Sequence, residues 1–226
     1  MADAGLHLIF IDGNHENHRE LRSQLPDESG FSPIRPHLWW APRGQRWKWH
    51  GVSFLALGGA VSLDRRMRVA GRSWWPEEAT TEEDLQRAIG AGHADVMLTH
   101  DAPEGVLDPD LLRIRSSISP ARWAILKRII GAEDLARSRA NRELLRRATE
   151  AVSPRWLFHG HHHLRHESYL DLASGRKVRV IGLDRDGSGD EQWLVVDLNS
   201  LERECQGTPV GKDGSVDTTQ RPTGLG

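Results

Sequence analysis

Trp156-Leu157-Phe158-His159-Gly160-His161-His162-His163 is the stretch that decides the fold, because it places a cluster of histidines directly after a short apolar run. A run of this kind ahead of a glycine is typical of a buried parallel strand that ends in a loop. In open α/β sheets such loops lie at the carboxyl edge, where residues from distant parts of the chain converge. The stretch therefore predicts a polar site at the end of a strand.

Two other segments repeat this pattern. Val96–Leu98 is followed by Thr99-His100-Asp101, and Leu6–Ile11 is followed by Asp12 and then by Gly13-Asn14-His15-Glu16. We expect each apolar run to be a buried parallel strand, so that the polar residues after it meet at one sheet edge. Imidazole nitrogens and amide oxygens are ligands of Zn, Fe and Mn. Together the three segments predict a divided metal site.

The order and spacing of these segments resemble those of the calcineurin-like metallophosphoesterases, over roughly Leu6 to Leu198. In that family Gly-Asn-His-(Asp/Glu), a later single histidine and a terminal Gly-His-x-His carry much of a dinuclear metal centre. The resemblance implies an α/β fold in which a two-layered β-sandwich is flanked by helices, in an α/β/β/α order. We expect this domain to occupy residues 1–200. The Gly-, Thr-, Asp- and Pro-rich residues 201–226 are expected to be a disordered tail.

The resemblance also implies a role for each site residue. Asn14, His100 and His161 would bind one metal ion, and His163 would bind the other. His15 would act on the leaving group as a general acid or charge stabiliser. The implied activity is the hydrolysis of a phosphomonoester or phosphodiester by metal-bound hydroxide, with divalent Mn, Fe or Zn as cofactor.

The chain departs from the family at its amino terminus. Family members carry an Asp-x-His and a Gly-Asp-x-x-Asp upstream of Gly-Asn-His, whereas only Met1–Gly5 precedes the first apolar run here. We therefore expect an amino-terminally truncated domain without a bridging carboxylate, unless Asp12 or Asp101 replaces it. The alternative is an inactive domain that binds a single metal ion or a phosphate-bearing partner. A purely structural metal module is disfavoured, because such sites usually use cysteines and Cys205 is the only one.

The rest of the sequence predicts alternating strands and helices. Strands are expected at 38–41, 45–50, 52–57, 156–158, 165–172, 177–182 and 192–197. Helices are expected at 16–24, at 81–89, from Pro120 after a Ser119 cap, and at 133–151. The helix at 16–24 would open from the Asn14 turn and point its positive amino terminus at a bound phosphate.

One further loop could contact the substrate. Arg72 and Trp74 would line the substrate mouth, where an arginine can hold a phosphate through two hydrogen bonds. The alternative is that Trp74 only packs against its neighbours. We interpret His18 as an ordinary packed or surface residue, and we expect His162 to point away because alternate residues of a strand face opposite sides.

Composition limits the remaining classes. A chain of 226 residues with 38% hydrophobic residues can form one substantial core. The net charge of -2 gives no general attraction to nucleic acid or anionic membranes, and the basic segment 137–147 is interpreted as a solvated helix face. The apolar runs are too short to span a membrane, and the amino terminus shows no basic segment followed by a long apolar stretch, so we expect no secretion. We expect a cytoplasmic protein whose partner is a phosphate ester.

Overall fold

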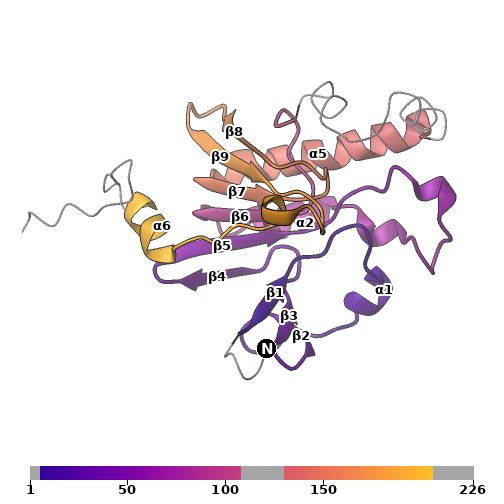
Figure 1. The fold of residues 1–226 in the computed structure, drawn as a ribbon, viewed down its shortest axis with the longest axis horizontal. Coiled ribbons are helices and arrows are strands. Elements are labelled where there is room, and N and C mark those ends of the chain that lie inside the picture. Colours follow the sequence, from indigo (N-terminus) through magenta and orange to yellow (C-terminus); the bar gives the residue numbers. More distant parts are fainter. Residues whose placement is uncertain (1–5, 108–129, 206–226) are drawn as a thin grey trace, which may run out of the picture.

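The protein is a mixed α/β chain with two β-sheets, one of six strands and one of three (Figure 1). The computed structural model describes residues 6–107 and 130–205. Within these two ranges, no helix is both long enough and apolar enough to cross a membrane. The α/β class expected from the sequence is confirmed.

The six-stranded sheet carries two of the three histidine segments. Its strands follow the order β4 (Arg46–Trp49), β5 (Val52–Leu57), β6 (Val96–Thr99), β7 (Trp156–His159), β9 (Lys177–Gly182) and β8 (His166–Asp171). β5, β6, β7 and β9 run parallel, while β4 and β8 pair antiparallel at the two edges. The carboxyl ends of the four parallel strands therefore meet at one edge.

Local sequence explains these strands. Leu55, Met97 and Leu157 in the central strands are fully buried, as expected for parallel strands that are covered on both faces. β4 and β5 are joined by His50 and Gly51, whose φ angles of 46° and 79° are typical of a two-residue hairpin turn. The strands predicted at 45–50 and 52–57 are thus confirmed.

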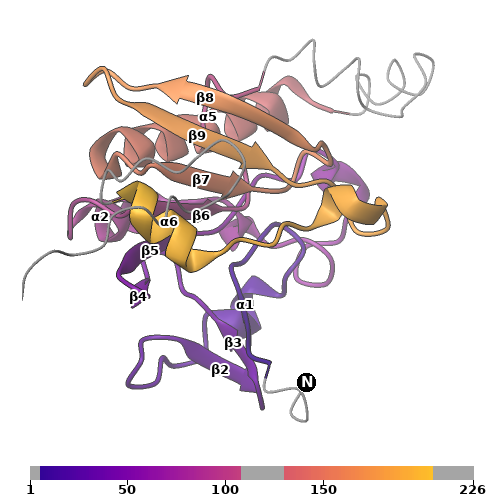
Figure 2. The same cartoon turned by 60° about the vertical axis from the view of Figure 1, so that its left-hand side comes forward.

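Helices cover both faces of this sheet. α2 (Glu82–Ile89) and α5 (Ala132–Val152) pack on one face, where Leu85 and Leu145 join the core of β5, β6 and β7 (Figure 1). α2 begins at Thr81 with both hydrogen bonds of a capping box, close to the predicted start. α6 (Leu198–Cys205) lies over the other face, where Leu201 packs with Phe54 of β5 (Figure 2).

The three-stranded sheet has the order β1 (Leu8–Phe10), β3 (Leu38–Trp40) and β2 (Ser32–Arg35). β1 is parallel to β3, and among the described residues it pairs with no other strand. Leu8 is consequently 48% exposed, so the expectation of a buried strand is wrong for this run. Phe31 and Ala41 pack against Ala56 of β5 and hold the small sheet beside the large one.

Two predicted elements are wrong. The helix expected at 16–24 is only α1 (His18–Leu21), because the Asn17 side chain caps it by accepting from the Glu20 amide and Pro26 disfavours helix beyond it. The strand expected at 192–197 is absent from the described structure. A 3-10 turn (Gly189–Gln192) replaces its start, and residues 194–196 instead line a hollow over the sheet face with Trp156 and Phe158.

The expected tail is also shorter than predicted, since α6 continues to Cys205. The Ser119–Pro120 helix start and residues 206–226 lie outside the described residues.

Candidate metal centre

Three loops from distant parts of the sequence meet beyond the ends of β1, β6 and β7. The amide of Gly59, just after β5, donates to the carbonyl of Asp12 at 2.8 Å. The amide of Gly160 donates to the carbonyl of His100 at 3.1 Å. These backbone bonds bring the Asp12–Glu16 loop, His100 and the 159–163 segment to one place, as the sequence predicted.

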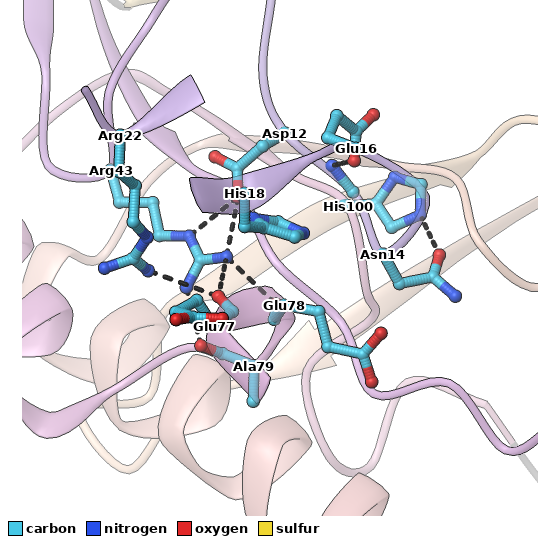
Figure 3. Close-up of polar contacts among 12 residues, drawn as sticks. Asp12, Asn14, Glu16, His18, Arg22, Arg43, Glu77, Glu78, Ala79 and His100 are labelled. Atoms are coloured by element: carbon cyan, nitrogen blue, oxygen red, sulfur yellow. Dashed lines mark hydrogen bonds and ion pairs between the residues drawn. The ribbon is translucent and has the colours of Figure 1, made fainter. Parts of the chain in front are cut away.

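Asn14 and His100 face each other directly (Figure 3). Oδ1 of Asn14 lies 3.2 Å from Nε2 of His100. Gly13 permits this approach, because a Cβ there would lie only 2.6 to 2.8 Å from the His100 ring. The Glu16 carboxylate closes the turn by accepting from the Gly13 amide at 2.8 Å.

A buried chain of hydrogen bonds sets the orientation of the Asn14 amide. Nδ2 of Asn14 donates to Oγ of Ser62 at 2.9 Å, and this hydroxyl donates to Oε2 of Glu78 at 2.7 Å. Oε1 of Glu78 accepts from the Ser62 amide at 2.7 Å, and Glu78 is fully buried. Because the Ser62 proton goes to Glu78, the hydroxyl can only accept from Asn14. The amide nitrogen is therefore fixed on that side, and the oxygen faces His100.

His161 completes this group. Its ring centroid lies 5.2 Å from that of His100, and its φ of 65° is in the left-handed region that residues other than glycine rarely adopt. Burial lowers the pKa of His100 to about 4 and the pKa of His161 to about 3. Both imidazoles are therefore neutral near pH 7, which is the form that binds a metal ion.

A second buried network holds His162. Nε2 of His162 donates to Oδ1 of Asp101 at 2.8 Å, and Nδ2 of Asn141 on α5 donates to Oδ2 at 3.0 Å. Burial raises the pKa of Asp101, but the hydrogen bonds from His162 and Asn141 help to outweigh it, and the pKa falls to about 2. The ring of His162 also lies 5.0 Å from that of His161. The expectation that His162 points away is wrong, because β7 ends at His159 and strand alternation does not reach position 162.

Asp12 belongs to a separate buried ion pair (Figure 3). Its Oδ2 accepts from Nε and Nη2 of Arg43 at 2.8 and 2.6 Å, and its Oδ1 accepts from Trp40 at 3.2 Å. Arg43 also donates to Asp84 of α2 at 3.0 Å and to the backbone carbonyls of residues 77–79. Asp12 thus ties the small sheet to α2.

His15 and His163 lie on the exposed side of the site. The ring nitrogens of His15 are 3.1 and 3.3 Å from the two terminal nitrogens of Arg68. His163 follows His161 and His162 in a left-handed conformation, with a φ of 51°. The structure therefore separates His163, exposed to solvent, from the enclosed group of Asn14, His100 and His161.

Two of the enclosed donor atoms are spaced as two ligands of one divalent ion are. Two ligands bound to the same zinc-sized ion at about 2.1 Å are roughly 3.0 to 3.5 Å apart, and the Asn14 oxygen and His100 nitrogen are 3.2 Å apart. Two neutral imidazoles and an amide oxygen suit Zn, Fe or Mn. Within residues 6–107 and 130–205, no group of three or more His, Cys, Asp or Glu side chains could hold a metal ion, and the Asn14, His100 and His161 group contains only two such side chains.

The loop expected to line the substrate mouth makes other contacts. Trp74 lies between Arg65 and Arg137, whose Cζ atoms are 5.5 and 5.8 Å from the centroid of its ring. Arg72 is exposed, and its side chain makes no hydrogen bond or ion pair with any residue that the structure describes. Within this loop, Arg68 is the arginine that contacts His15.

Sequence reasoning missed the residues that support the site, namely Ser62, Glu78, Arg68 and Asn141. Ser62 gave a weak signal, because it is a polar residue shortly after the buried run of β5. The others gave none, since a charged or amide residue in a polar segment normally indicates surface.

A scan of the chain against protein-family models finds no match, and a search among curated proteins finds none either.

Proposed function

We propose that the chain is a metal-dependent phosphoesterase of the calcineurin-like metallophosphoesterase kind, which hydrolyses a phosphomonoester or phosphodiester. The observation that carries the proposal is the meeting of Asn14 Oδ1, His100 Nε2 and the His161 ring beyond the ends of three separate strands. The amide oxygen is held toward the imidazole by the buried Ser62 and Glu78. A preorganised donor set of this kind is what a catalytic metal site requires.

Asn14, His100 and His161 would hold one ion of Mn, Fe or Zn. When bound, such an ion supplies Lewis acidity to a phosphoryl oxygen and lowers the pKa of water. The protein contributes ligands that carry no charge, because both imidazoles are neutral near pH 7. The site therefore adds no negative charge that would repel a phosphate.

His15 is the residue that we assign to the leaving group. It is adjacent to Asn14 in the chain and exposed, so a substrate can reach it from solvent. Its backbone is held by Glu16, whose carboxylate accepts from the amides of Gly13 and His15 at 2.8 and 3.2 Å. A histidine in this place can donate a proton or stabilise charge on the departing oxygen.

A second candidate is a domain that binds one metal ion or a phosphate without turnover. The observation that favours it is the state of the two carboxylates next to the candidate ligands. Asp12 is paired with Arg43, and Asp101 accepts from His162 and Asn141. Neither is free to bridge two ions, and a single imidazole, His163, does not hold a divalent ion tightly.

Metal content and hydrolysis separate the two candidates. Protein loaded with Mn²⁺ is analysed by mass spectrometry for bound metal and then assayed with para-nitrophenyl phosphate and its bis-ester. The phosphoesterase proposal predicts turnover that is lost in His100→Ala and His161→Ala. Turnover should persist in His50→Asn, a matched change at the exposed β4–β5 turn.

The outcomes are distinct. Turnover at the wild-type rate in His161→Ala would overturn the phosphoesterase proposal. One equivalent of metal without turnover would favour the second candidate.

The detailed fold that the resemblance implies and the expected cellular setting are also part of this proposal. The two-layered α/β/β/α sandwich of the family stays a prediction, beside a structure in which a six-stranded sheet has helices on both faces and a three-stranded sheet lies next to it. The cytoplasmic setting also stays a prediction.

A further inference from the structure

We infer that Arg68 is a phosphate-binding residue of this site, an inference that rests on the proposed function. Nη1 and Nη2 of Arg68 lie 3.1 and 3.3 Å from Nδ1 and Nε2 of His15, the residue assigned to the leaving group. The guanidinium therefore lies beside the residue that we assign to the leaving group, where the phosphoryl oxygens of a substrate would come within its reach.

The hydrogen-bonding capacity of Arg68 is only partly used. A guanidinium has five N–H donors and no acceptor, whereas a neutral imidazole accepts at one ring nitrogen only. At most one of the two contacts with His15 is therefore a hydrogen bond. Nε pairs with Asp64 at 2.8 Å, and Nη1 donates to the Ser73 carbonyl at 3.4 Å. At least two N–H groups of Arg68 thus have no acceptor among the described residues.

The segment that carries Arg68 is fixed to the rest of the protein. Arg68 directly follows a 3-10 turn (Arg65–Met67) whose two arginines donate to the buried Asp134 of α5 at 2.7 and 3.1 Å. The Arg68 side chain itself is only 14% exposed. Its guanidinium is therefore held in place before any ligand arrives, which reduces the entropy cost of binding.

The chemistry of this arrangement suits a phosphoryl group. The planar guanidinium matches two phosphate oxygens and forms charge-assisted hydrogen bonds with them. The candidate metal ligands add no negative charge, and Arg68, which pairs with Asp64 through Nε, has its two terminal nitrogens at His15, the neighbour of Asn14.

The test measures binding of inorganic phosphate by equilibrium dialysis, with and without Mn²⁺, to the wild type and to variants. Arg68→Met should weaken phosphate binding about 10-fold or more, as expected for the loss of a charge-assisted hydrogen bond. Arg68→Lys should weaken phosphate binding less, because lysine keeps the positive charge but lacks the paired N–H donors of the planar guanidinium. Arg19→Met controls for net charge and should stay within about twofold of wild type, because the exposed Arg19 side chain makes no hydrogen bond or ion pair with the described residues.

Each result decides between explanations. Unchanged Mn²⁺ binding and weakened phosphate binding in Arg68→Met, with circular dichroism like wild type, would support the inference. Phosphate affinity within about twofold of wild type in Arg68→Met, or a larger effect from Arg72→Met, would overturn it. If wild type binds phosphate through Arg68 but no Mn²⁺, the metal-dependent function fails and the phosphate site stands. If wild type binds no phosphate in either condition, the Arg68 inference fails.

Discussion

Replacing Ser62 by alanine should weaken metal binding without removing any ligand. The Ser62 hydroxyl accepts from Asn14 Nδ2 and donates to Glu78 Oε2, so its loss leaves both groups buried without that partner. An unsatisfied buried carboxylate oxygen costs about 1 to 3 kcal/mol of folding free energy. The Asn14 amide would also be free to turn its nitrogen toward His100, and an amide nitrogen offers no lone pair to an ion. Loss of such a supporting contact typically costs about 10- to 100-fold in metal affinity, or about 1.4 to 2.7 kcal/mol.

The assay is Mn²⁺ titration by calorimetry, combined with urea unfolding of the metal-free protein. Ser53→Ala is a matched control, because Ser53 makes a similar pair of hydrogen bonds with Asp95 near the amino end of β5. Both variants should lose comparable stability, but only Ser62→Ala should lose metal affinity. If Ser62→Ala destabilises the fold while its Mn²⁺ affinity stays within about twofold of wild type, the orientation of Asn14 does not control the site.

Three further predictions concern the surroundings of the site. Arg43→Met should lower the free energy of unfolding by about 3 to 5 kcal/mol, because it leaves the buried Asp12 and Asp84 without their cation, and urea melts showing a loss below 1 kcal/mol would contradict this. Gly13→Ala should abolish tight Mn²⁺ binding, since its Cβ would lie 2.6 to 2.8 Å from the His100 ring, and wild-type affinity in calorimetry would show that the ring can move aside. Burial lowers the pKa of His18 from 6.5 to about 4, so the unfolded chain binds this proton first as pH falls and stability drops between about pH 6.5 and 4. The free energy of unfolding of the wild type should therefore fall by about 2 kcal/mol more between pH 7.5 and pH 5 than that of His18→Leu. Equal falls in the two proteins, measured by urea unfolding, would show that His18 does not have a lowered pKa.

The sequence predicted the frame of the site well because strand and loop signals are local. The apolar runs before His100 and His159 are β6 and β7, and the turn chemistry at His50-Gly51 gives the β4–β5 hairpin. The apolar run around Leu8 has the same sequence pattern as these two, but it pairs with β3 in the small sheet. Nothing within a short apolar run specifies which sheet it joins, so its burial was predicted wrongly.

The supporting contacts could not be predicted, because they join residues far apart in the chain. Asn14 and Ser62 are 48 residues apart, and Asp101 and His162 are 61 apart. Glu78 is a charged residue in a polar segment, and only the fold shows that it is buried against Ser62. The place of Arg72 at the substrate mouth stays a prediction, and no sequence pattern indicated that Arg68 contacts His15.

X-ray absorption spectroscopy of protein carrying one equivalent of Zn²⁺ tests the metal assignment most directly. The structure places two imidazoles and one amide oxygen together, so the spectrum should fit two histidine ligands with oxygen completing the shell, and His100→Ala should lose one of the two. A spectrum without imidazole ligands, or one that His100→Ala and His161→Ala leave unchanged, would show that the metal binds elsewhere.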